Sequence, residues 1–132
     1  MRRKPKHFSI REVVFKTEPL FIYDCPYKQM GQWLRKAYNV DIPKEDGTES
    51  ACVLHFDGPP YRVVWFQRLS DSLESRGEVA HELLHLVVRI CRDKGIPIVA
   101  NIQTGECGDE SAAYLIDFFV REVYRHVKKK KK

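Results

Sequence analysis

The sequence predicts one α+β domain in which a small mixed or antiparallel sheet packs on the last two of three helices. Its 132 residues suffice for one hydrophobic core and are too few for two domains. Short β-branched and aromatic stretches occur in two pairs, within residues 9–24 and 51–68, and three segments have helical periodicity. The resulting order, β-β-α-β-β-α-α, is typical of an α+β fold.

The first three elements are predicted within residues 9–40. Residues 9–16 and 19–24 are expected to be strands, separated by a break between Thr17 and Pro19. Residues 26–40 are expected to form an amphipathic helix that ends near Asn39. Its apolar stripe has the spacing i, i+3, i+4, i+7 and i+8, and consists of Met30, Trp33, Leu34, Ala37 and Tyr38.

Residues 51–58 and 61–68 are predicted to be two strands, and the turn sequence DGPP between them favours a hairpin. The second strand is either an internal strand or an edge strand that binds an extended substrate. His55 stands alone on the first strand, so we interpret it as a structural or surface residue.

The helical pattern of the second helix is expected to begin after residues 69–78, and the helix is expected to end at Gly95 and Pro97. Either Asp71 with Glu74 or Ser75 with Glu78 can form a capping box at its start. Its apolar residues occupy so much of the helix circumference that we expect it to be largely buried. They are Leu83, Leu84, Leu86, Val87, Val88, Ile90 and Cys91.

The third helix is predicted to run from about Asp109 into the lysine tail, with Asp109 and Glu110 at the positive end of its dipole. Its expected core-facing residues are Ala113, Leu115, Ile116, Phe119, Val120 and Val123.

Basic residues concentrate at the two ends of the chain. Nine of the 23 lysines and arginines, and none of the 18 acids, lie in residues 2–6 and 128–132. We expect a basic tail at residues 1–7, a single domain at 8–127 and a solvated polylysine tail at 128–132. The positive charge of the tails would suit nucleic-acid binding. We do not favour this function, because no aromatic residues interleave with the lysines.

The sequence predicts a cytoplasmic protein without a membrane partner. Its start lacks the apolar region of a secretory signal, and no apolar run approaches the length of a membrane span. The four cysteines lack the paired spacing of a structural zinc site, so we expect reduced thiols.

The sequence HELLH provides the candidate chemistry, because it places His81 and His85 one helical turn apart. Both imidazoles can then bind one metal ion, while Glu82 can reach a water on that ion and act as a general base. On so hydrophobic a helix, three unpaired polar side chains would cost several kcal/mol together. A bound metal would offset this cost.

A catalytic zinc site normally has three protein ligands, so a third must come from elsewhere in the chain. The candidates after the turn are Glu106, Cys107, Asp109 and Glu110. Glu110 is favoured because it lies in the first turn of a helix that can pack beside the HELLH helix. The alternative for these acids is helix capping.

The segments VAHELLHLV and DESAAYLIDFFV together resemble the gluzincin pattern. They closely resemble small zincin-like proteins encoded by phages and prophages. This resemblance implies a minimal zincin-like metallopeptidase that holds one zinc ion through His81, His85 and Glu110, with Glu82 as its general base.

Tyr114 departs from the pattern of larger gluzincins, some of which have an aspartate at this position. Tyr114 either acts in catalysis, by orienting a ligand or polarising a substrate carbonyl, or packs in a helix interface.

The expected partner is a peptide or protein substrate. Two alternatives remain at the level of sequence: a zinc-stabilised scaffold without catalysis, and an accessory module that uses the basic termini to bind nucleic acid or protein. Cleavage specificity and oligomeric state do not follow from the sequence.

Overall fold

The computed structural model describes residues 5–44, 49–96, 98, 100–101, 106–107 and 110–130. The predicted α+β fold is confirmed, and a short antiparallel pair, β5 and β6, adds to the predicted elements. In chain order the elements are β1 (Lys6–Ser9), β2 (Leu20–Tyr23), α1 (Tyr27–Tyr38), β3 (Ala51–His55), β4 (Arg62–Phe66), α2 (Leu73–Lys94), β5 (Ala100–Asn101), β6 (Glu106–Cys107) and α3 (Glu110–Lys130).

The main sheet is mixed and has the strand order β1-β2-β4-β3. Strands β1 and β2 are antiparallel, β2 and β4 are parallel, and β3 and β4 form the predicted antiparallel hairpin. Strand β4 is therefore internal, which decides the alternative that the sequence left open. Strand β3, the neighbour of β4, is an edge strand of this sheet.

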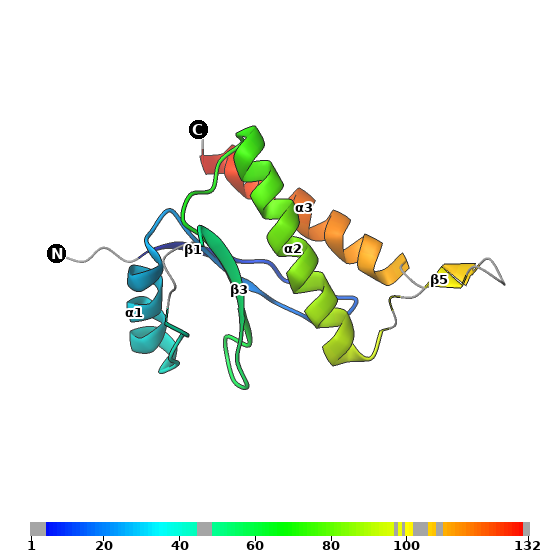
Figure 1. Cartoon of the computed structure of the whole chain (residues 1–132), viewed down its shortest axis with the longest axis horizontal. Coiled ribbons are helices and arrows are strands. Elements are labelled where there is room, and N and C mark those ends of the chain that lie inside the picture. The colour runs from blue at the N-terminus through cyan, green and yellow to red at the C-terminus, as the bar shows by residue number, and fades with distance from the viewer. Residues whose placement is uncertain are drawn as a thin grey trace.

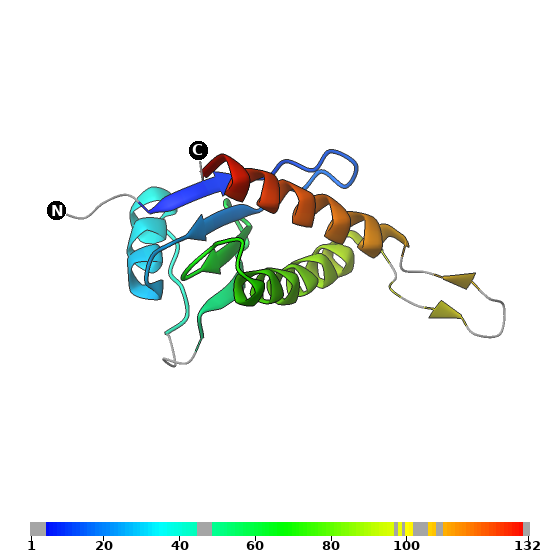
Figure 2. The same cartoon turned by 90° about the horizontal axis from the view of Figure 1, so that it is seen from above.

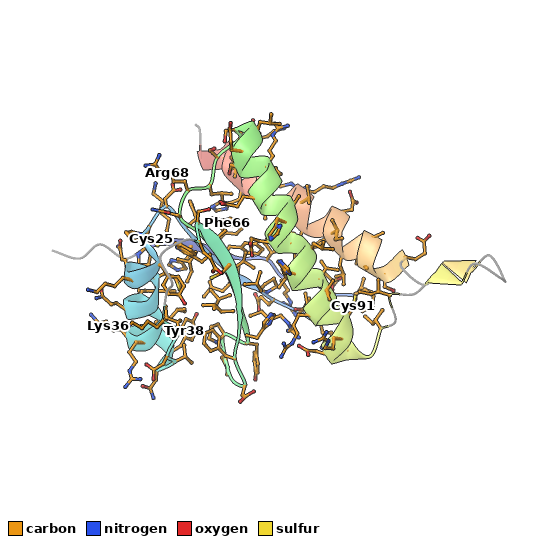
Figure 3. All side chains as sticks on the ribbon, in the orientation of Figure 1. Cys25, Lys36, Tyr38, Phe66, Arg68 and Cys91 are labelled. Atoms are coloured by element: carbon orange, nitrogen blue, oxygen red, sulfur yellow. The ribbon has the colours of Figure 1, made fainter. Side chains whose placement is uncertain are left out.

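The sheet lies between α1 on one face and α2 with α3 on the other (Figures 1 and 2). Alternate residues of β2 and β4 supply the two cores, as the two-residue period of a strand requires. Phe21, Tyr23, Val64 and Phe66 pack toward α2 and α3. Leu20, Ile22, Val63 and Trp65 pack toward Met30 and Leu34 of α1. Figure 3 labels Phe66 from the first core and Cys25 from the second.

The prediction of a strand at residues 9–16 is wrong for most of that segment. Backbone hydrogen bonds join Glu12 and Thr17, and residues 13–16 form the turn between them. The buried Glu12 carboxylate accepts the backbone N–H groups of Val14 at 2.7 Å and Phe15 at 2.8 Å. This local bonding competes with strand pairing and overrides the β propensity of two adjacent valines.

Strand β1 precedes this turn and includes Lys6 and His7, which the sequence assigned to the basic tail. At the other end, α3 continues to Lys130, inside the predicted polylysine tail. Helix α3 thus runs into the lysine tail, as the sequence predicted. Lysine side chains at a helix C-terminus suit the negative end of the helix dipole.

The predicted ends of α1 and α2 are confirmed, whereas the predicted start of α2 is not. Asn39 and Gly95 follow the two helices in the left-handed conformation, with φ of 57° and 69°. At the start of α2, the Ser72 side chain accepts the backbone N–H of Ser75 and is the N-cap. Neither Asp71 nor Ser75 caps the helix, so both predicted capping boxes are wrong.

Helix α2 is buried on one side only, contrary to expectation. Leu83, Leu86 and Ile90 are fully buried, but Leu84 is 52% exposed and Val88 39% exposed. The sheet and α3 cover one side of α2, and neither Leu84 nor Val88 belongs to the core on that side.

Helix α3 also presents a slightly different face to the core than predicted. Its buried residues are Ala112, Leu115, Phe119, Val123 and Val127. Ala113 is exposed, and Ile116 and Val120 are half-buried beside this stripe. Among the described helices, none combines the length and the apolar character that crossing a membrane requires.

Candidate functional site

An open groove of about 1020 Å³ lies between the edge strand β3 and α2. Strand β3 supplies residues 51–55 to one wall. Helix α2 supplies the other wall with Gly77, Glu78, His81, Glu82, His85, Val88, Arg89 and Arg92. The apolar side of α2 is held against the core, so its HELLH side is left to face the groove. Figure 1 shows β3 beside α2.

His81 and His85 converge in this groove. Their Nε2 atoms are 3.2 Å apart, and their ring centroids are 4.8 Å apart. Two nitrogen ligands at about 2.0–2.1 Å from a tetrahedral zinc ion lie about 3.3 Å from each other. The spacing of the pair therefore fits two positions of such a site.

The two histidines are not buried, contrary to the expectation from the hydrophobic sequence of this helix. The side chain of His81 is 68% exposed, and His85 is exposed as well. Water can satisfy both rings, so their presence on α2 carries no large desolvation cost. Of the three polar residues of the HELLH motif, only Glu82 is buried.

Glu82 is buried next to the histidine pair, with 7% of its surface exposed. Its Oε1 atom is 3.9 Å from Nε2 of His81. Burial raises the pKa of Glu82, and the nearby His81 and His85 offset this only in part. A carboxylate with a raised pKa accepts a proton more readily than an ordinary one, as a general base must.

The structure does not bring a third ligand to the pair. Among the residues that the structure describes, no group of three His, Cys, Asp or Glu side chains is arranged to hold a metal ion. Glu110 begins α3 with an exposed side chain and does not line the groove. Asp109 lies outside the described residues, as do the side chains of Glu106 and Cys107. The third ligand stays a prediction.

Tyr114 also lies away from the groove. Its hydroxyl donates a hydrogen bond of 2.9 Å to Oε1 of the buried Glu12, and this bond raises the pKa of Tyr114. Its ring lies 6.1 Å from that of Phe15, between α3 and the turn. These contacts correspond to the packing alternative, and among the described residues no contact supports the catalytic one.

No family model, curated protein or solved structure matches the chain. The candidate site thus depends on the spacing, burial and charge of its own residues. Within it, the histidine pair and Glu82 are the part that the sequence predicted and the structure brings together.

One end of the groove was not predicted to belong to the site: Arg89 and Arg92 line it, together with His55, which we had interpreted as a structural or surface residue. Helical spacing alone could have placed Arg89 and Arg92 beside the histidines, because they follow His85 by four and seven positions on the same face of the helix. His55 had no such signal, since its approach to α2 depends on how the sheet packs.

Proposed function

We propose that the protein is a zinc-dependent metallopeptidase that hydrolyses peptide bonds in the groove between β3 and α2. The observation that carries this proposal is the 3.2 Å separation of the His81 and His85 Nε2 atoms beside the buried Glu82. The resemblance of the two motifs to zincin-like proteins supports it. His81 and His85 would hold one zinc ion, and Glu110 remains the favoured third ligand.

The residues of the chain have separate roles in this reaction. When bound, zinc supplies Lewis acidity, which lowers the pKa of a water molecule and polarises a carbonyl group. Glu82 accepts a proton at its carboxylate and returns it to the departing amine. Its burial favours the first transfer because it raises the pKa of Glu82. Its position beside His81 keeps that proton close to the site.

The edge strand β3 is the proposed binding surface for the substrate. An edge strand carries backbone N–H and C=O groups without a strand partner on one side, and an extended peptide can pair with them. Because β3 borders the same groove as His81 and His85, a peptide paired with β3 would pass the histidines. A cytoplasmic location is part of the proposal, and the buried free thiols of Cys25 and Cys91 agree with it.

Glu82→Gln tests the proposed mechanism, because it preserves side-chain size and removes the base. We expect zinc content to be unchanged and the rate of peptide hydrolysis to fall by about 10²–10⁴-fold. Zinc is measured by mass spectrometry and cleavage by chromatography on a diverse peptide library. Glu74→Gln is the matched control, since Glu74 lies on the same helix and does not line the groove.

Two outcomes would contradict the proposal. A zinc-loaded Glu82→Gln variant that cleaves as fast as the parent excludes Glu82 as the base. A zinc-loaded parent that cleaves no peptide in the library favours the zinc-stabilised scaffold instead.

A further inference from the structure

Charge is distributed unequally along the groove. At the end where β3 begins, Glu49 and Glu78 line the groove, and the Ser50 hydroxyl donates to the Glu78 carboxylate. At the end where β3 stops, the groove is lined by His55, and α2 contributes Arg89 and Arg92. The histidine pair and Glu82 lie between these two ends on α2. Lys44 lines the groove as well. Along α2 and β3, a bound peptide therefore meets acidic groups on one side of the site and basic groups on the other.

The basic end is assembled from three elements. Arg62 of β4 donates to Oδ2 of Asp93 at 2.8 Å, and Nε of Arg89 donates to Oδ1 of the same residue at 3.2 Å. Burial alone would raise the pKa of Asp93, but the hydrogen bonds and charges of Arg62 and Arg89 lower it overall. Asp93 is thus ionised and holds Arg89 beside the end of β3.

At this end the arginines outnumber the acids. His55 Nδ1 and Arg62 Nε are buried, and neither has a hydrogen-bond partner within the described part of the chain. Three arginines, Arg62, Arg89 and Arg92, face two acids here, Asp57 and Asp93. Guanidinium groups carry five N–H donors each and bind carboxylates with two parallel hydrogen bonds. The side chain of Arg89 is 43% exposed and Arg92 is exposed, so a carboxylate in the groove can reach both guanidinium groups.

Helix capping explains only part of this cluster. Arg92 lies in the last turn of α2, where a positive charge suits the helix dipole. The dipole does not account for His55 and Arg62, because these residues come from β3 and β4. They line one pocket of about 280 Å³ together with Arg89, and this pocket adjoins the groove.

We propose that His55, Arg89 and Arg92 form a subsite that binds a carboxylate of the substrate peptide. This inference rests on the proposed function, since it names the substrate class of the same groove. Arg89 and Arg92 lie about 6 and 10 Å beyond His85 along the helix, at about 1.5 Å per residue. An extended peptide advances about 3.3 Å per residue. The carboxylate therefore belongs within about three residues of the cleaved bond.

The test uses the zinc-loaded full chain and pairs of acetylated, amidated octapeptides from a randomised library. Each pair differs by Glu or Gln at one position. Binding is measured by fluorescence anisotropy and cleavage by mass spectrometry. We expect Glu to be preferred to Gln by about tenfold at one position, as for a charge-assisted hydrogen bond. A further pair with a free or an amidated C-terminus distinguishes a terminal carboxylate from an acidic side chain.

Variants link the preference to the subsite. Arg89→Gln combined with Arg92→Gln should abolish the preference for Glu. Arg121→Gln is the matched control, because Arg121 also pairs with an aspartate on its own helix, Asp117 at 3.1 Å, and does not line the groove. Arg92→Glu alone changes an exposed residue and should shift the preference from Glu to Lys, which tests the subsite even where the double variant unfolds.

The outcomes separate this inference from the proposed function. Cleavage without any preference for Glu overturns the subsite and leaves the metallopeptidase proposal intact. A preference that persists in the arginine variants also overturns it, as does a lack of binding to every pair. Charge-selective binding that depends on the arginines, without cleavage, upholds the subsite and counts against the metallopeptidase.

Discussion

At the scale of single residues, two of the glutamates that the structure describes are buried, and they are in opposite situations. Glu12 is fully buried and accepts hydrogen bonds from two backbone N–H groups and the Tyr114 hydroxyl. Glu82 is buried beside two histidines, and burial raises its pKa. A carboxylate with all its hydrogen bonds in place is a structural group, whereas one that holds its proton more tightly is suited to proton transfer.

Tyr114→Phe distinguishes the structural from the catalytic role of the tyrosine. Loss of its hydrogen bond to Glu12 should lower the free energy of unfolding by about 1 kcal/mol, while zinc content and hydrolysis stay unchanged. Denaturant unfolding and peptide cleavage measure the two effects. Tyr38→Phe, at an exposed position on α1, should change stability by less than about 0.5 kcal/mol. A large loss of hydrolysis at unchanged stability would instead indicate a catalytic Tyr114.

At the scale of elements, α2 joins the core to the candidate site. Its buried side, with Leu83, Leu86 and Ile90, anchors it against the sheet and α3. Its opposite side holds His81 and His85 in the groove. Because the α-helical backbone sets the angle between these two sides, packing the apolar residues also orients the histidines toward β3.

Replacing the N-cap of α2 tests where this helix begins. Ser72→Ala should lower the free energy of unfolding by about 1 kcal/mol, and Ser72→Gly by only a few tenths. The Ser72 hydroxyl accepts the Ser75 N–H at 3.1 Å, and alanine leaves this donor without its partner. Thermal and denaturant unfolding give the measurement. A larger loss for Asp71→Ala than for Ser72→Ala would favour the capping box at Asp71 that the sequence predicted.

At the scale of the whole molecule, the third ligand decides how zinc affects stability. His81 and His85 belong to one helix, so binding to them alone connects no distant parts of the chain. A ligand at or near the start of α3 would join α3, or the segment before it, to α2. Zinc binding would then oppose unfolding of the whole domain.

We expect zinc to raise the melting temperature, and Glu110→Gln to reduce zinc retention far more than Glu106→Gln. A free zinc concentration of about 100 times the dissociation constant adds about 2.7 kcal/mol to stability. Calorimetry with and without a chelator, and zinc content by mass spectrometry, provide the readouts. Full retention by the Glu110 variant, with loss on changing Glu106, Cys107 or Asp109, moves the third ligand to that residue. Identical melting curves for zinc-loaded and chelated protein would contradict the link between zinc and folding.

The sequence by itself determined the features of this protein that depend on local spacing. The helical periods of α1, α2 and α3 were readable because apolar residues recur every three or four positions. Asn39 and Gly95 marked helix ends because both residue types tolerate the left-handed conformation. The HELLH spacing predicted the convergence of His81 and His85, because four residues make about one helical turn.

Only the tertiary structure decided the features that depend on contacts between distant residues. The order β1-β2-β4-β3 makes β3 an edge and β4 internal, and both strands have similar compositions in sequence. The turn at Glu12 is closed in part by Tyr114, which is 102 residues away. His55 meets Arg89 because β3 packs beside α2. A sequence pattern reports which side of an element is apolar, whereas the neighbour of each side follows from the packing of the whole chain.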